Sequence, residues 1–205
     1  MSAALEQRLA AVRNRYAEPQ RHYHGVAHLD HLLRSFTEIR SLLRKPDAVR
    51  IAIFYHDAIY WPERSDNEVA SARLMRDELD GLVELDLLAN AEALILATRD
   101  HRIPAGLGAD VAADCALFLD MDISVLGADA AVFDIYEAGI AAEYRPHYDF
   151  AAYGAGRAAV LDGFLGRARL FLSDAFAPLE ERARGNLSRS LQALRSPGHM
   201  ASTSV

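Results

Sequence analysis

Apolar residues recur three or four positions apart along almost the whole chain of 205 residues, and this helical spacing is the feature that most constrains the fold. No segment shows the alternation, the β-branched residues and the flanking turns that are typical of a strand. The pattern therefore predicts an all-α fold, a single-domain helical bundle. Helices are expected at Ala4 to Arg13, His28 to Arg44, Asp47 to Tyr60, Asn67 to Leu79, Leu85 to Arg99, Ala109 to Leu119, Ala130 to Tyr144, Tyr153 to Leu172 and Ala177 to Leu194.

Length and composition predict one domain over residues 1–195, followed by a flexible tail at 196–205. A chain of this length can bury one substantial core, and its 51% apolar and 25% charged residues are typical of a globular protein. The last residues, SPGHMASTSV, are small and polar and lack helical periodicity.

The charge balance and the single cysteine exclude several classes of protein. A net charge of −7 disfavours extended nucleic-acid binding, so a small anionic substrate would need a local cationic site. Cys115 is the only cysteine, which excludes an internal disulfide and indicates a reducing compartment, the cytoplasm. The N-terminus lacks the pattern of a signal peptide, and the apolar runs are shorter than the roughly 20 residues that a membrane span requires. Oligomeric state has no readable signature.

Four histidines, His22, His24, His28 and His31, fall within ten residues at the start of an amphipathic helix. His28 begins the apolar stripe of that helix, so its imidazole should point toward the core. A buried imidazole needs a polar partner.

The doublet His56-Asp57 ends another apolar helical stripe. Burying a carboxylate costs several kcal/mol unless it is paired or coordinated, and an inward His-Asp pair suits a shared divalent cation. Taken alone, the doublet also fits a solvated helix end or an ordinary ion pair.

Two further segments place polar residues after apolar helices. His101 follows the stripe that ends at Thr98, and alone it fits a core histidine bonded to backbone equally well. Asp120 and Asp122 follow the next helix, and Asp122 shares the larger apolar face with Cys115. Asp122 is therefore preferred as a metal ligand, and Asp120 is kept as the alternative or as a supporting residue.

Together these residues resemble the HD superfamily of metal-dependent phosphohydrolases, whose pattern is an early His, a His-Asp doublet in a helix and a late Asp. The residues His28, His56, Asp57 and Asp122 match this pattern in order and type. A longer set of motifs, from about residue 15 to residue 171, looks like a bacterial family of predicted HD phosphohydrolases, with one departure at Gln20, where His is expected. These motifs are Arg15-Tyr16, Glu18-Pro19, Arg21, His22-Tyr23-His24 with His28, His56-Asp57, Asp66-Asn67-Glu68 with Ser71-Ala72, Ala97-Thr98 with His101, LDMDISVLG, Glu143-Tyr144 and Arg157.

The resemblance implies an HD-type domain whose metal is held by the four matching residues. Cyclic-nucleotide phosphodiesterases are more distantly similar, through Tyr23-His24 with His28 and through Asp122-Ile123-Ser124. That similarity implies His24 as general acid and Asp122 as the last ligand.

Two imidazoles and two carboxylates suit Mn, Fe, Co, Zn or Mg and leave open positions on a six-coordinate ion. The expected function is divalent-metal-dependent hydrolysis of a phosphate ester or phosphoanhydride, such as a nucleotide or a related small phosphorylated metabolite, by metal-activated water. Asp57 or Asp122 could accept the proton of that water, and Glu68 could orient a ligand or the water.

Four further residues are candidates for a second metal or for substrate binding. They are His101, Asp120, Arg15 and Arg21. Arginine near the motifs would supply positive charge to a phosphate in an otherwise acidic protein.

The alternative function is a nucleotide-sensing, metal-binding HD module without turnover. Open coordination positions favour the enzyme, because a structural site would be closed by protein ligands. An HD oxygenase is a third interpretation, but it needs a second metal and ligands beyond His101. The sequence leaves open whether the hydrolase is a phosphomonoesterase, a phosphodiesterase or a nucleotidase.

Overall fold

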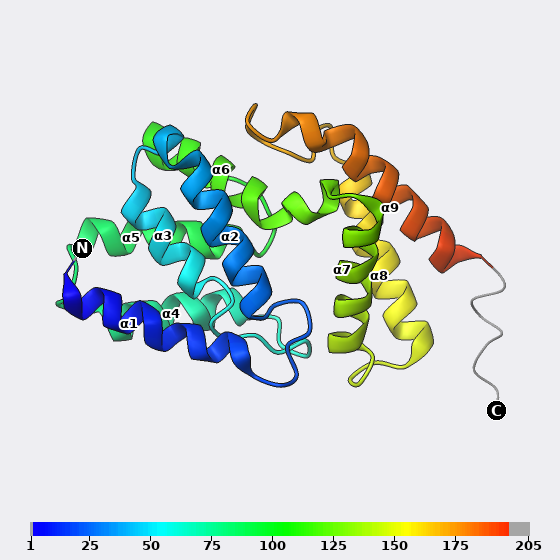
Figure 1. Cartoon of the computed structure of the whole chain (residues 1–205), viewed down its shortest axis with the longest axis horizontal. Helices are drawn as coiled ribbons and strands as arrows, with labels where there is room; N and C mark the ends of the chain where they lie inside the picture. Colours follow the sequence, from blue (N-terminus) through cyan, green and yellow to red (C-terminus); the bar gives the residue numbers. More distant parts are fainter. Residues whose placement is uncertain (1, 197–205) are drawn as a thin grey trace. The chain divides into compact units, whose positions relative to one another are not determined.

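A computed structural model describes residues 2–196, and every regular element within this range is helical, which confirms the all-α prediction. The described chain forms two compact units, one through Asp122 and the other from Ile123 onward (Figure 1). Residues 197–205 of the predicted tail lie outside the described residues.

The first unit is organised around α3, which contacts α1, α2, α4 and α5 (Figure 1). Pro46 begins α3, where its missing N–H leaves no partner unsatisfied. Residues 51–55 of this helix are all buried, because α3 is apolar on every side and has neighbours on every side. The helices of this unit are α1 (Ala3–Arg13), α2 (Val26–Ile39), α3 (Pro46–Tyr55), α4 (Asn67–Leu79), α5 (Leu85–Ala97) and α6 (Ala109–Ile123), with 3₁₀ turns at Asn14–Ala17 and Arg40–Leu42.

The second unit contains its own apolar core, in which Phe133, Leu161, Phe171 and Leu187 are completely buried. Asn186 donates two hydrogen bonds of 2.9 Å to backbone carbonyls at the start of this unit. Its elements are a 3₁₀ turn at Ser124–Gly127, α7 (Ala130–Tyr144), α8 (Phe150–Leu165), a 3₁₀ turn at Ala177–Leu179 and α9 (Glu180–Arg195).

The predicted helices all occur, and the differences lie at their ends. The helix expected from Asp47 to Tyr60 corresponds to α3, which ends at Tyr55. The His-Asp doublet therefore follows this helix and does not lie within it. In contrast, α6 continues through Asp122 to Ile123, so both aspartates are helical instead of following a helix. Other ends move as well: α2 stops at residue 39, α5 at residue 97 and α8 at residue 165. Helix ends depend on which groups satisfy the terminal peptides, and those groups come from elsewhere in the chain.

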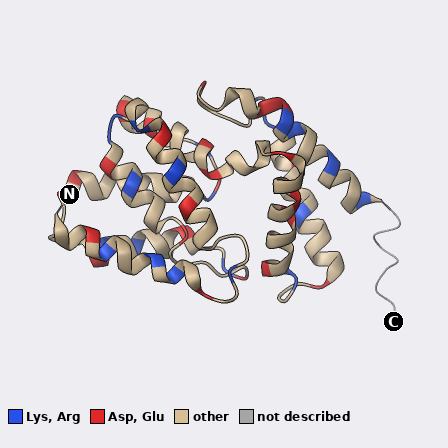
Figure 2. Cartoon of the chain, viewed as in Figure 1, with Lys and Arg blue, Asp and Glu red and all other residues tan. Residues whose placement is uncertain are grey.

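Charged residues of both signs are interspersed along the helices of each unit (Figure 2). Several arginines of the second unit pair with acidic residues of the same unit, including Arg182 with Asp129 and Arg189 with Asp134. None of the helices in the described range combines the length and the apolar character that crossing a bilayer requires.

Asp114 of α6 holds the start of α3 in the first unit. Its carboxylate is 1% exposed and accepts hydrogen bonds from the backbone N–H groups of Arg44, at 2.8 Å, and Lys45, at 2.6 Å. Asp114→Ala should lower the free energy of unfolding by about 2 kcal/mol, because hydrogen bonds to a charged group contribute about 1.5 to 3 kcal/mol. Urea denaturation measures this loss, and Asp114→Asn, which keeps one acceptor oxygen, should lose less. Equal stability of Asp114→Ala and the wild type would show that the contact does not hold the loop.

Candidate metal centre

The His-Asp doublet is positioned by two buried side chains from the segment between α1 and α2. The Tyr16 hydroxyl donates to the carbonyl oxygen of Phe54 at 3.0 Å and accepts from the N–H of Asp57 at 3.3 Å. The Arg21 guanidinium, with a side chain 1% exposed, donates to the carbonyl oxygens of Asp57 at 2.6 Å and Ala58 at 3.2 Å. These bonds replace the helical partners of the last peptides, and α3 therefore ends at the doublet.

Two polar residues of α4 hold the loop that follows the doublet. Asn67 exchanges side-chain hydrogen bonds with both the N–H and the carbonyl of Trp61, at 3.1 and 2.9 Å. The Ser71 hydroxyl does the same with Ile59, at 3.0 and 3.2 Å. Reasoning from the sequence assigned no role to Tyr16, Asn67 or Ser71, and the only available signal was their presence in the motifs that carry the HD resemblance.

His28 lies in the first turn of α2, 4% exposed, as its place on the apolar stripe predicts. Its ring packs between the rings of Tyr23, at a centroid distance of 5.0 Å, and His56, at 5.3 Å. Among the described residues, its Nδ1 is the one buried side-chain nitrogen or oxygen without a hydrogen-bond partner. Histidines that bind metals usually donate from their second nitrogen, and His28 departs from this pattern. Its ring is held by packing against Tyr23 and His56.

Three ligand atoms, one each from His28, His56 and Asp122, lie within 4.8 Å of one another and could hold a metal ion. His28 Nε2 is 3.2 Å from His56 Nε2 and 3.1 Å from Asp122 Oδ1, and His56 Nε2 is 3.6 Å from that oxygen. Adjacent ligands lie about 3.0 Å apart on an octahedral ion with bonds of about 2.1 Å, and about 3.4 Å apart on a tetrahedral one. The spacing of the three atoms therefore fits a single divalent cation.

Asp57 lies beside this group. Its Oδ2 is 3.0 Å from His56 Nε2, the spacing of adjacent ligands, but 3.8 Å from His28 Nε2, and Asp57 is not in the converging group. The N–H at Nδ1 of His56 donates to the carbonyl of Ile53 at 2.9 Å, so a neutral His56 presents the lone pair of Nε2 to the group. The structure therefore brings His28, His56 and Asp122 together, and the Asp57 carboxylate lies beside His56.

The histidines of the group hold its two carboxylates in the ionised form. Burial raises the pKa of Asp57, but the charge of His56 and its hydrogen bond to Asp57 lower that pKa by more. The net result is a pKa well below the usual range of an aspartate. Burial also raises the pKa of Asp122, and hydrogen bonds from His101 and His28 outweigh it and lower the pKa. For His56, burial lowers the pKa, but Asp57 and Asp122 raise it to about 9. Both carboxylates are therefore ionised at neutral pH, and a divalent cation could replace the proton that His56 otherwise holds.

His101 contacts the outer oxygen of Asp122. Its Nε2 lies 2.9 Å from Asp122 Oδ2, while Oδ1 of the same carboxylate faces His28. Its backbone φ is 48°, in the left-handed region, and His101 is the one non-glycine residue in the described range with a positive φ. This conformation turns the chain after α5 and directs the imidazole at α6.

His24 lies in the turn before α2 and not one helical turn before His28, because α2 begins only at Val26. The His24 ring is nevertheless close, with its centroid 6.0 Å from that of His28. It stacks on the Tyr60 ring at 4.0 Å, and its carbonyl accepts a hydrogen bond from Arg21 at 3.2 Å. His24 therefore has a defined position at the edge of the candidate centre.

The other candidate residues are placed differently. Asp120 is completely buried in α6 and is not part of the three-residue group, to which Asp122 belongs. The Arg21 guanidinium is buried and is bonded to Glu18 and to the backbone carbonyls of His24, Asp57 and Ala58. Arg15 forms an ion pair with Glu78 of α4, in which its guanidinium Nη2 lies 3.7 Å from Glu78 Oε1. Glu68, in the first turn of α4, lies near Arg99, whose pKa it helps to raise after the larger effect of Asp100.

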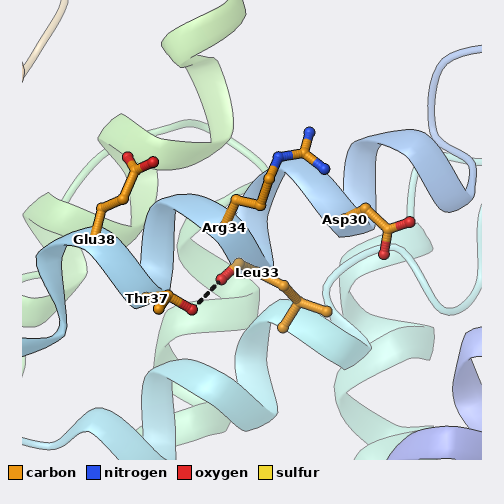
Figure 3. Close-up of a pocket in the computed structure, with 5 residues that line it drawn as sticks. All are labelled: Asp30, Leu33, Arg34, Thr37 and Glu38. Atoms are coloured by element: carbon orange, nitrogen blue, oxygen red, sulfur yellow. Dashed lines mark hydrogen bonds between the residues drawn. The ribbon is translucent and has the colours of Figure 1, made fainter.

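A shallow hollow of about 420 Å³ lies on the outer face of α2, and Figure 3 shows the side chains that line it. Leu33 and Thr37 face away from His28 by helical geometry. Thr37 donates to the carbonyl of Leu33 at 2.9 Å, and Asp30 is bonded to Arg13. This hollow is therefore separate from the candidate metal centre.

Comparisons of the chain with protein-family models, with curated proteins and with solved structures give no match.

Proposed function

We propose that this protein is an HD-type, divalent-metal-dependent phosphohydrolase that acts on a small phosphorylated substrate such as a nucleotide. The observation that carries the proposal is the convergence of His28 from α2, His56 from the turn after α3 and Asp122 from α6, at the spacing of ligands around one ion and with Asp57 beside His56. This convergence supports a metal site, and the phosphohydrolase activity is proposed from the resemblance of the same residues to the HD pattern.

A divalent cation bound by these four residues would supply water activation and charge neutralisation at the phosphoryl group. Side chains of the protein would accept the proton of the attacking water and protonate the leaving oxygen. Asp57 directs Oδ2 at His56, and its other oxygen is the candidate acceptor for the proton of the attacking water. Asp57 is 14% exposed at its side chain, so solvent reaches the edge of this carboxylate.

His24 is the candidate general acid for the leaving oxygen. A protonated His24 lowers the pKa of Asp57, after the larger effects of burial and of His56, so the two side chains lie within electrostatic reach. Stacking on Tyr60 and the hydrogen bond from Arg21 to its carbonyl restrict the orientation of His24. Such restriction is what a proton donor needs, because proton transfer requires hydrogen-bond distance to the leaving oxygen.

The test is a screen of chelator-treated protein, resupplied with Mn²⁺, Co²⁺, Zn²⁺ or Mg²⁺, against nucleoside monophosphates, cyclic nucleotides, nucleoside triphosphates and p-nitrophenyl phosphate. We expect close to one metal per chain by elemental analysis and release of phosphate or nucleoside from at least one ester. His56→Ala should lack both, and His147→Ala, which changes an exposed histidine in the second unit, should retain both.

Two outcomes would contradict the proposal. Protein that neither contains metal nor is stabilised against heat by added metal lacks the centre altogether. Protein that binds a nucleotide stoichiometrically but releases no product is instead a nucleotide-sensing module.

A further inference from the structure

We infer that His101 is a positioning residue that donates a hydrogen bond to Asp122 Oδ2 and thereby directs Asp122 Oδ1 to the metal. This inference rests on the proposed metal centre and assigns a task to a residue outside the four ligands. Its basis is the division of the Asp122 carboxylate, whose Oδ2 lies 2.9 Å from His101 Nε2 and whose Oδ1 lies 3.1 Å from His28 Nε2.

The direction of the hydrogen bond follows from the chemistry of the two groups. An ionised carboxylate can only accept, so Nε2 of His101 must carry the proton. What distinguishes His101 from His28 is position. His28 Nε2 lies 3.2 Å from His56 Nε2 within the converging group, whereas His101 lies outside that group and contacts the other oxygen of Asp122.

A second metal between His101 and Asp122 would also have too few protein ligands. Within residues 2–196, His28, His56 and Asp122 form the one group of three or more histidine, cysteine or acidic side chains with converging ligand atoms. His101 and Asp122 together would supply two protein ligands, fewer than the three or more that protein metal sites usually provide.

The backbone of His101 supports a specific task at this position. A non-glycine residue in the left-handed region is uncommon, and such strain persists where the surrounding structure holds it, often at functional sites. The side chain is 22% exposed, so burial of the ring does not by itself explain the conformation. The left-handed conformation directs the imidazole from the end of α5 to α6. The hydrogen bond to Asp122 therefore accounts for this conformation.

The test compares metal binding by the wild type, His101→Ala, His101→Gln and His101→Gly. His101→Ala should bind one Co²⁺ per chain with about 10- to 100-fold weaker affinity, the usual loss when the partner of a metal ligand is removed. His101→Gln, whose amide N–H can occupy the place of Nε2–H, should recover most of that affinity. The visible absorption of bound Co²⁺ should change in His101→Ala, because a freed Asp122 alters the ligand set.

His101→Gly separates positioning from a merely structural role. Glycine adopts a positive φ without strain, so this variant should be more stable to urea than His101→Ala, which loses the same hydrogen bond. Its metal affinity should nevertheless be as weak as that of His101→Ala.

Each contrary result has a distinct meaning. A wild type that binds no metal overturns the proposed function and this inference with it. A wild type that binds one metal, with His101→Ala binding equally tightly, overturns this inference alone. Two metals in the wild type that fall to one in His101→Ala would make His101 a ligand and also overturn it.

Discussion

Replacing His28 with alanine is expected to remove the bound metal and the hydrolytic activity together. His28 Nε2 lies 3.2 Å from His56 Nε2 and 3.1 Å from Asp122 Oδ1, so its loss opens one side of the donor group. Removal of a direct ligand should weaken metal affinity by more than the roughly 10- to 100-fold that follows from loss of an outer partner. Elemental analysis after gel filtration and the rate with the best ester measure both effects.

Folding must be controlled, because His28 also packs against Tyr23 and His56. Circular dichroism and urea denaturation in the presence of chelator compare the metal-free variant with the metal-free wild type. His147→Ala, which changes an exposed histidine of the second unit, is the control and should retain the metal. A folded His28→Ala protein that keeps one tightly bound metal would remove His28 from the ligand set.

Replacing His24 with alanine is expected to leave the metal in place and to slow turnover by about 10² to 10⁴ for an ester whose leaving group needs a proton. The structure separates the two histidines: His28 faces the donor group, whereas His24 stacks on Tyr60 at the edge. Loss of the acid should therefore affect the chemical step and not the metal content. His22→Ala, two positions earlier and exposed, serves as the matched control.

The leaving group provides a sharper comparison for His24. The p-nitrophenolate ion departs readily without protonation, so His24→Ala should slow hydrolysis of p-nitrophenyl phosphate much less than hydrolysis of an alkyl phosphate ester. Equal slowing of both esters would indicate that His24 positions the substrate. Loss of metal from His24→Ala, as complete as from His28→Ala, would make His24 a ligand.

Local sequence determined the helical class and most of the helix positions. Apolar spacing of three and four residues is a local property, and it located α4 and α7 at the ends observed. The same spacing indicated that His28 points inward, and on the helix that precedes the late aspartates it distinguished Asp122 from Asp120. Because α6 continues through both aspartates, the helical face on which that choice was based does extend to residue 122.

The ends of helices and the partners of polar side chains were decided by tertiary structure. Nothing near residue 55 in the sequence stops α3; Tyr16 and Arg21, more than thirty positions earlier, take over its last peptide groups. Arginine beside a phosphohydrolase motif suggested a phosphate ligand, but only the fold shows the Arg21 guanidinium bonded to backbone carbonyls. The contact of His101 with Asp122 likewise depends on a left-handed residue that no local pattern marks. Periodicity is encoded in neighbouring residues, whereas hydrogen-bond partners depend on which distant segments the packed core brings together.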